Sequence, residues 1–105
     1  MKLADLKIIL DQTNIPVAYN HFKNAQKLPF ICYLDTNTNS LLADNKVHHL
    51  STVVDIELYT EIKDERLEEE LEKILNDNEL PFNKSGSFFI KDEDMFQTIY
   101  SIKLI

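Results

Sequence analysis

Cys32 has the most reactive side chain in the sequence, because a thiolate can act as a nucleophile or bind a metal ion. It lies between Ile31 and Tyr33 in an apolar run, and no basic side chain is next to it. A free cysteine in such a run usually behaves as a small buried hydrophobic residue. We therefore predict a thiol in the core. A single cysteine cannot form an internal disulfide. The absence of internal disulfides is typical of proteins in a reducing compartment.

His48 and His49, with Asp35 and Asp44 nearby, form the one cluster whose residue types suggest metal binding or acid–base catalysis. Adjacent residues on a strand point to opposite faces, so both imidazoles could not readily bind one ion there. In a loop they could, but the spacing specifies no third ligand. We expect a solvated loop or strand edge, and we keep a small enzyme that uses either histidine with Asp44 as an alternative.

The rest of the sequence lacks motifs that bind cofactors or metals. Gly86 is the only glycine, which excludes a glycine-rich phosphate loop, and there is neither a cysteine pair for zinc nor a His-Glu-x-x-His motif. The glutamates between Glu65 and Glu72 are typical of a solvated helix face. The sequence therefore predicts a protein that is not an enzyme, with no catalytic residue, cofactor or metal.

The composition predicts one globular domain over residues 1–105, with 44% hydrophobic residues to form a core. Residues 1–7 lack the apolar segment of a signal peptide, and no apolar stretch approaches the ~20 residues of a membrane helix. Residues 55–105 carry six basic and fourteen acidic side chains. This balance argues against direct nucleic-acid binding, because phosphates require clustered Lys and Arg. We expect protein partners and no membrane insertion.

The first half of the chain predicts one helix and two strands. A helix over residues 2–12 places four apolar residues on one face: Leu3, Leu6, Ile9 and Leu10. The apolar run 29–34 predicts a strand covered on both faces, and the Asp, Asn and Ser side chains of residues 35–40 predict a turn. A second strand is predicted over residues 50–60, with the core face formed by Thr52, Val54, Ile56 and Leu58. Its other face is expected to contact solvent or a partner.

The second half predicts a helix and two further extended segments. Asp64 is the expected N-cap of a helix that runs to about residue 76 and carries an apolar stripe of Leu67, Leu71, Ile74 and Leu75. Residues 85 and 86 predict a turn before a short strand over 88–90. A long strand over 95–104 follows, and the strand aromatics are expected in the core: Tyr59, Phe88, Phe89, Phe96 and Tyr100. This order predicts the α+β class, with a small, mostly antiparallel sheet of three to five strands and two helices packed on one face.

Several short segments resemble, in the same order, one family of phage proteins. They are Leu-Leu-Ala-Asp-Asn-Lys-Val at 41–47, Val-Asp-Ile-Glu-Leu-Tyr-Thr at 54–60, the glutamate-rich run 65–75, Leu-Pro-Phe at 80–82 and Met-Phe-Gln-Thr-Ile-Tyr at 95–100. With these segments the chain is similar to the tail-terminator, or tail-to-head joining, proteins of siphophages and prophages of Gram-positive bacteria. The resemblance extends from about residue 29 to residue 104.

The resemblance implies a structural virion protein of the phage tail or neck, made in the host cytoplasm. Such proteins form a ring, typically a hexamer, that caps the tail tube, stops its polymerisation and docks onto the head connector. The implied partners are further copies of the chain, the tail tube protein, and connector or neck proteins. DNA would pass through the ring without sequence-specific binding. The implied fold is a small α/β domain without catalytic residues or cofactor.

Two parts of the chain are candidate subunit interfaces, because a closed ring needs unlike surfaces on each subunit. The polar stretch 35–49 is longer than a hairpin requires, and its candidate residues are Asn37, Asn39, Asp44, Asn45 and Lys46. The outward face of the strand 50–60 supplies Val53, Asp55, Glu57 and Tyr59. An acidic surface could also line a channel through which DNA slides.

Two other functions agree with the same features. A neck or head-completion protein of the same module would share the size, the charge and the lack of chemistry, and would differ only in its position in the particle. An acidic inhibitor of a nucleic-acid-binding protein would be a stable monomer or dimer that binds a basic protein tightly.

Overall fold

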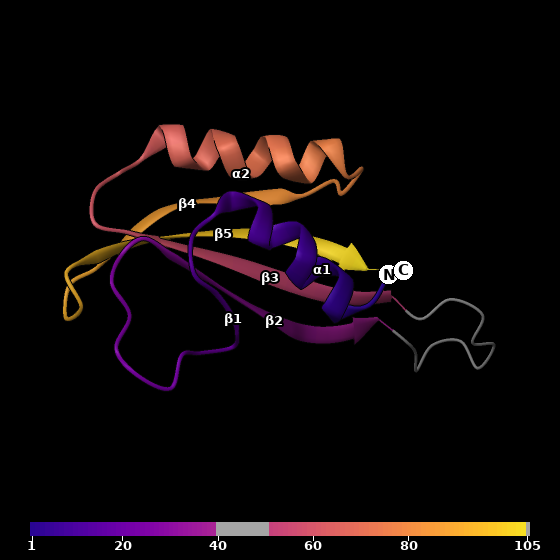
Figure 1. Cartoon of the computed structure of the whole chain (residues 1–105), viewed down its shortest axis with the longest axis horizontal. Coiled ribbons are helices and arrows are strands. Elements are labelled where there is room, and N and C mark those ends of the chain that lie inside the picture. The colour runs from indigo at the N-terminus through magenta and orange to yellow at the C-terminus, as the bar shows by residue number, and fades with distance from the viewer. Residues whose placement is uncertain (40–50, 105) are drawn as a thin grey trace.

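The computed structural model describes residues 1–39 and 51–104, which form a five-stranded sheet with two α-helices (Figure 1). In chain order the elements are α1 (Leu3–Leu10), the 3-10 turn η1 (Asp11–Thr13), β1 (Val17–Tyr19), β2 (Phe30–Asn39), β3 (Ser51–Thr60), α2 (Glu65–Asp77), β4 (Asn83–Ile90) and β5 (Met95–Leu104). The strand order is β1-β2-β3-β5-β4; β1 is parallel to β2, and the other neighbouring strands are antiparallel. The predicted α+β class with a mostly antiparallel sheet is confirmed.

Local hydrogen bonds explain where the two helices begin. The backbone N–H of Lys2 donates to the Asp5 carboxylate at 2.8 Å, so a side chain satisfies one polar group at the start of α1. Asp64 accepts a hydrogen bond from the backbone N–H of Leu67 at 3.1 Å, which confirms the predicted N-cap of α2. No helix in the described ranges combines the length and apolar content that a membrane span requires.

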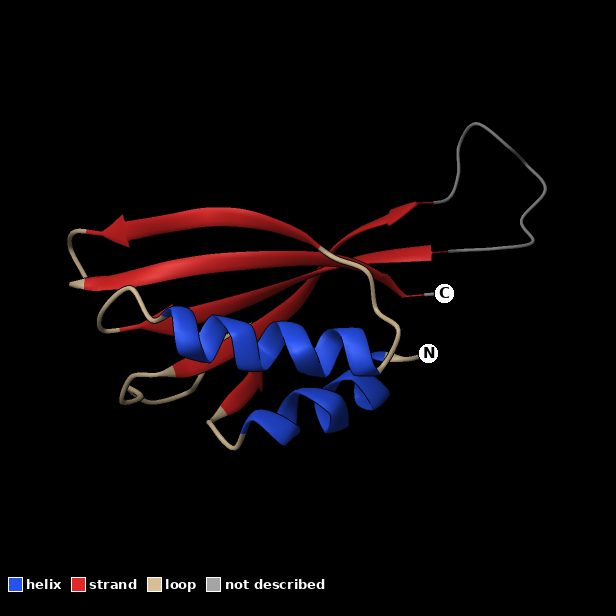
Figure 2. Cartoon of the chain, turned by 90° about the horizontal axis from the view of Figure 1, so that it is seen from above, coloured by secondary structure: helices blue, strands red, loops and turns tan. Residues whose placement is uncertain are grey.

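Both helices lie on the same side of the sheet, as predicted (Figure 2). Leu6 and Leu10 of α1, and Leu71 and Leu75 of α2, have no exposed surface. They pack against buried side chains of the central strands: Ile31, Tyr33, Val54, Ile56, Leu58, Tyr100, Ile102 and Leu104. Burial of apolar surface, at about 25 cal/mol per Å², is the main force that holds these two layers together.

The alternation predicted for the two long central strands is confirmed. In β3 every second residue from Val54 to Thr60 is buried, and the residues between them are half-buried. β5 has the predicted bounds, and every second residue from Thr98 to Leu104 is buried. Ile56 and Tyr100 lie directly opposite each other in the ladder, so the core faces of the two strands coincide.

The turn predicted over residues 35–40 is wrong for the residues that the structure describes. β2 continues to Asn39 and pairs with residues 51–54 of β3, with an irregularity between Asp35 and Asn37. Pairing along a long neighbouring strand outweighs the local turn preference of the Asp and Asn side chains. The long loop predicted over residues 35–49 therefore begins at least five residues later than expected.

Two further features of the sheet differ from the prediction. Ser85 and Gly86 lie inside β4 and not in a turn, although the register with β5 does shift between Lys84 and Ser87. A glycine beside a serine thus marks an irregularity within a strand, which is a common position for a bulge. The sequence did not predict β1, because three residues are too few to show an alternation.

Candidate interaction surface

The sheet face that points away from the helices is the candidate interaction surface, which we call the open face. Its central part is formed by Phe30, Cys32 and Leu34 of β2, Val53, Asp55, Glu57 and Tyr59 of β3, and Gln97, Ile99 and Ser101 of β5. Both described helices lie on the opposite side (Figure 2). Apart from buried Cys32, all these side chains are half-buried. A mixture of aliphatic, aromatic and hydrogen-bonding groups is typical of protein interfaces.

Hydrogen bonds between β3 and β5 fix the polar side chains of the open face. The Tyr59 hydroxyl donates to Glu57 Oε1 at 2.9 Å and accepts a hydrogen bond from Gln97 Nε2, also at 2.9 Å. Ser101 Oγ donates to Asp55 Oδ1 at 2.6 Å. Because each group already has a defined partner, the face is organised before any other molecule binds.

The environment of the open face raises the pKa of two of its groups, Glu57 and Tyr59. Burial raises the pKa of Glu57 above its ordinary value; the hydrogen bond from Tyr59 lowers it in part, and the nearby charge of Asp55 raises it. Burial, followed by the neighbouring Glu57, also raises the pKa of Tyr59. Within the described ranges, neither Asp55 nor Glu57 forms an ion pair with Lys or Arg.

The connection between β1 and β2, residues 20–29, packs against one end of the open face. Phe22 of this connection contacts Phe30 edge-to-face, with ring centroids 5.4 Å apart, and Phe30 stacks on Tyr59 at 5.0 Å. A hollow of about 550 Å³ separates the connection from Ile90 and Met95 at the β4–β5 end. Aromatic side chains therefore form an apolar end to the open face, next to the carboxylates of β3.

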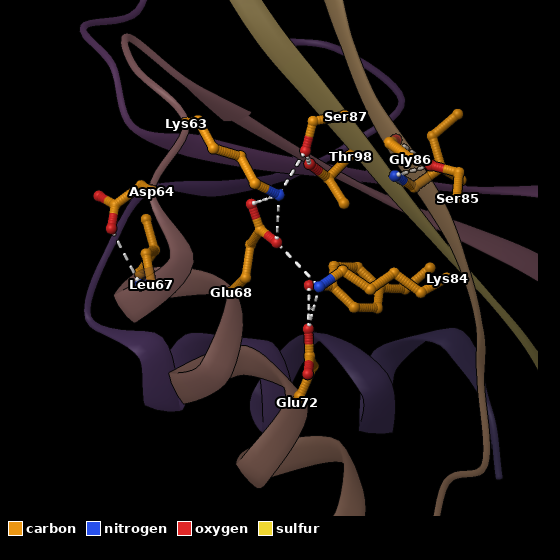
Figure 3. Close-up of polar contacts among 12 residues, drawn as sticks. Lys63, Asp64, Leu67, Glu68, Glu72, Lys84, Ser85, Gly86, Ser87 and Thr98 are labelled. Atoms are coloured by element: carbon orange, nitrogen blue, oxygen red, sulfur yellow. Dashed lines mark hydrogen bonds and ion pairs between the residues drawn. The ribbon is translucent and has the colours of Figure 1, made fainter.

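A second polar cluster, on the helix side of the sheet, joins α2 to β4 (Figure 3). Only 3% of Glu68 is exposed, and its two oxygens each lie 2.8 Å from a lysine, Lys63 and Lys84. Lys84 also pairs with Glu72 at 2.7 Å, and Lys63 Nζ donates to Ser87 Oγ at 2.9 Å. The prediction that Glu68 is solvated is wrong, because α2 directs it at β4, where two lysines compensate its charge.

Charge compensation controls protonation in this second cluster. Burial alone would raise the pKa of Glu68, but hydrogen bonds and charges from Lys63 and Lys84 together hold it below its ordinary value. The Tyr100 hydroxyl donates to Glu72 at 2.7 Å, and burial followed by this contact raises the pKa of Tyr100. Every charged group here has a partner from the chain itself, so the cluster stabilises the packing of α2 on the sheet edge.

The predicted interface residues fall into three groups. Val53, Asp55, Glu57 and Tyr59 lie together on the open face, as the alternation of β3 predicted. Asn37 and Asn39 lie in β2 and not in a loop, and their side chains are outside the described part of the structure. Asp44, Asn45 and Lys46 also lie outside the described residues.

Sequence reasoning missed the contribution of the neighbouring strands to the open face. Gln97, Ile99 and Ser101 alternate with the core residues of β5, so they must point to the other side of the sheet. The alternation within β5 can be read from the sequence, but the order of the strands in the sheet cannot. Pairing β5 beside β3 places Gln97 opposite Tyr59 and Ser101 opposite Asp55.

The prediction for the aromatic residues is confirmed in part. Tyr100 is fully buried, whereas Phe88 and Phe89 are 54% and 51% exposed. Tyr59, also predicted in the core, is half-buried on the open face. Phe88 and Phe89 lie on β4, which is an edge strand of the described sheet and has less of the core to cover it. Phe89 retains one ring contact, with Phe96 at 5.2 Å between centroids.

Among the described residues, the His, Cys, Asp and Glu side chains form no group that could bind a metal ion, and Cys32 lies in an unreactive environment. No group of three or more His, Cys, Asp or Glu residues in the described ranges could hold a metal ion. His48, His49 and Asp44 lie outside those ranges. Cys32 is buried, as predicted, and burial followed by the charge of Glu57 raises its pKa, which disfavours the reactive thiolate.

In comparison with known proteins, the chain matches no protein-family model and no curated protein sequence. The similarity to tail-terminator proteins therefore rests on the short segments of the sequence itself.

Proposed function

We propose that this chain is a structural subunit that assembles with other protein subunits through the open face. The observation that carries the proposal is the arrangement of the central strands, which present half-buried aliphatic and aromatic side chains on the side opposite both described helices. Hydrogen bonds already fix the side chains of Tyr59 and Gln97 in the single chain. Binding a partner therefore costs little conformational entropy at these two side chains. A rigid tyrosine with an apolar ring and a polar hydroxyl is a common anchor of interfaces.

The segments that resemble tail-terminator proteins specify this role further. In the proposed role the chain forms a ring, with six copies as the working number, that caps the phage tail tube and joins it to the head connector. Its partners are further copies of itself, the tail tube protein and the connector or neck proteins, and its place is the virion. The role requires protein contacts and no catalysis, cofactor or membrane.

Deletion of the gene from the phage or prophage that carries it tests the proposed role. We expect tail tubes of uncontrolled length and filled heads without tails, observed by negative-stain electron microscopy, and normal particles after complementation with the wild-type gene. Tails of normal length that lie apart from heads would support a neck or head-completion role instead. Normal, infectious particles from the deletion strain would contradict both roles.

A further inference from the structure

The β1–β2 connection lies in a stretch of the chain without acidic residues. This stretch, residues 12–34, contains no Asp or Glu, so all 18 acidic residues of the chain lie elsewhere. This stretch contains His21, Lys23 and Lys27, whose side chains are all exposed. Neither lysine forms an ion pair within the described ranges. The connection is therefore an exposed basic segment in an acidic protein.

The open face carries Asp55 and Glu57, which form no ion pair with a described Lys or Arg, although Lys103 of β5 lies on the same face opposite Val53. Asp55 and Glu57 are half-buried, and their described hydrogen-bond donors are the neutral hydroxyls of Ser101 and Tyr59. A carboxylate has about four acceptor positions, so both groups can accept further hydrogen bonds. A cation that arrives with a partner would compensate charges that the described part of the molecule leaves uncompensated.

We propose that the open face of one copy receives the β1–β2 connection of a second copy, with Lys23 and Lys27 pairing with Asp55 and Glu57. This inference rests on the proposed function, because it names the two surfaces through which the subunits meet. In a single copy the connection lies over the Phe30 end of the face, and neither lysine pairs with these carboxylates. The two lysines and the two carboxylates are therefore available for contact between copies.

The contact joins unlike surfaces, which determines the kind of assembly it produces. Each copy in a pair retains one unused connection and one unused open face, so further copies can add, and the chain of contacts closes into a ring when the rotation permits. A symmetric contact between two open faces would instead bring the carboxylates of both copies together, which electrostatic repulsion disfavours. Charge complementarity thus favours the head-to-tail arrangement.

A charge-exchange experiment tests the contact. The variants are K23E/K27E on the connection and D55K/E57K on the open face, with molar mass measured by light scattering behind size exclusion and folding checked by circular dichroism. We expect each variant alone to remain at the monomer mass of 12.3 kDa at concentrations where the wild type assembles. An equimolar mixture should recover assembly, because each reversed surface then finds a reversed partner. The matched control R66E/K73E changes the net charge equally on exposed positions of α2, and should assemble as the wild type does.

The outcomes distinguish failure of this contact from failure of the proposed function. If the wild type assembles and folded K23E/K27E assembles equally well, the contact is wrong and the proposed function stands. Failure of the mixture to assemble when both variants are folded also overturns the contact. If D55K/E57K does not fold, D55N/E57Q replaces it and must weaken assembly in the same way. A wild type that stays monomeric at every concentration contradicts the self-assembly on which both proposals rest.

Discussion

At the scale of single residues, Glu68 shows how a charged group is kept in the interior of this protein. Two lysines from different segments contact its carboxylate: Lys63, before α2, donates to both oxygens, and Lys84, on β4, contacts Oε1. The cluster therefore connects the start of α2 to the edge strand, where few apolar contacts are available. Removal of the central charge leaves two cations facing each other, which makes Glu68 the sensitive position of the cluster.

We predict that Glu68→Gln lowers the free energy of unfolding by about 2 kcal/mol, because hydrogen bonds to charged groups contribute roughly this much. Urea denaturation followed by circular dichroism measures the effect. The control is Glu69→Gln, which removes an exposed glutamate from the same helix and should change stability by less than about 0.5 kcal/mol. Equal stability of the two variants would contradict the role of the cluster.

The same carboxylate predicts a pH dependence with a defined sign. The folded protein holds the pKa of Glu68 below its ordinary value of 4.5, so the unfolded chain binds more protons in this range. Its contribution to stability is therefore present above about pH 4.5 and is lost as the pH falls through the folded pKa. The difference in unfolding free energy between wild type and Glu68→Gln should shrink from about pH 7 to about pH 3. Glu57, whose pKa is raised, acts in the opposite direction in both proteins and cancels in the difference. A difference that does not change with pH would contradict this assignment.

Cys32 should react slowly with a thiol reagent such as Ellman's reagent while the protein is folded. Its side chain is buried and its pKa is raised, so both access and the thiolate fraction are low. In denaturant the same thiol should react rapidly and completely. Rapid reaction in native buffer would show that this part of the open face is accessible and would contradict a core thiol.

At the scale of elements, the sequence predicts best those features that short-range rules determine. The bounds of β5, the N-cap of α2 and the core faces of β3 and β5 follow from alternation and capping. The turn predicted at residues 35–40 fails because pairing with β3 overrides local preference. The position of Glu68 and the full open face depend on which strands are neighbours, and periodicity within one segment does not contain that information.

The N-cap of α2 gives a prediction at the same scale. Asp64→Ala should lower the free energy of unfolding by about 1 kcal/mol, because it removes the acceptor of the Leu67 N–H. Asp64→Asn keeps an acceptor and should lower it much less. Thermal or urea unfolding of the two variants distinguishes the cap from a general charge effect, and equal losses would contradict the cap.

At the scale of the whole molecule, the described chain has two unlike sides. One side of the sheet is covered by both helices (Figure 2) and forms the core. The other side carries the open face with its carboxylates and aromatic end. A basic connection lies at one end of that face. We propose that the molecule assembles head to tail through these unlike surfaces.

The most direct test of that claim is the molar mass of the purified wild-type protein, measured by light scattering behind size exclusion over a wide range of concentrations. Assembly predicts a mass that rises with concentration from 12.3 kDa towards about six subunits and falls again as salt is raised. A strict monomer at every concentration and at low salt would contradict it, and would favour an acidic inhibitor that binds a basic protein.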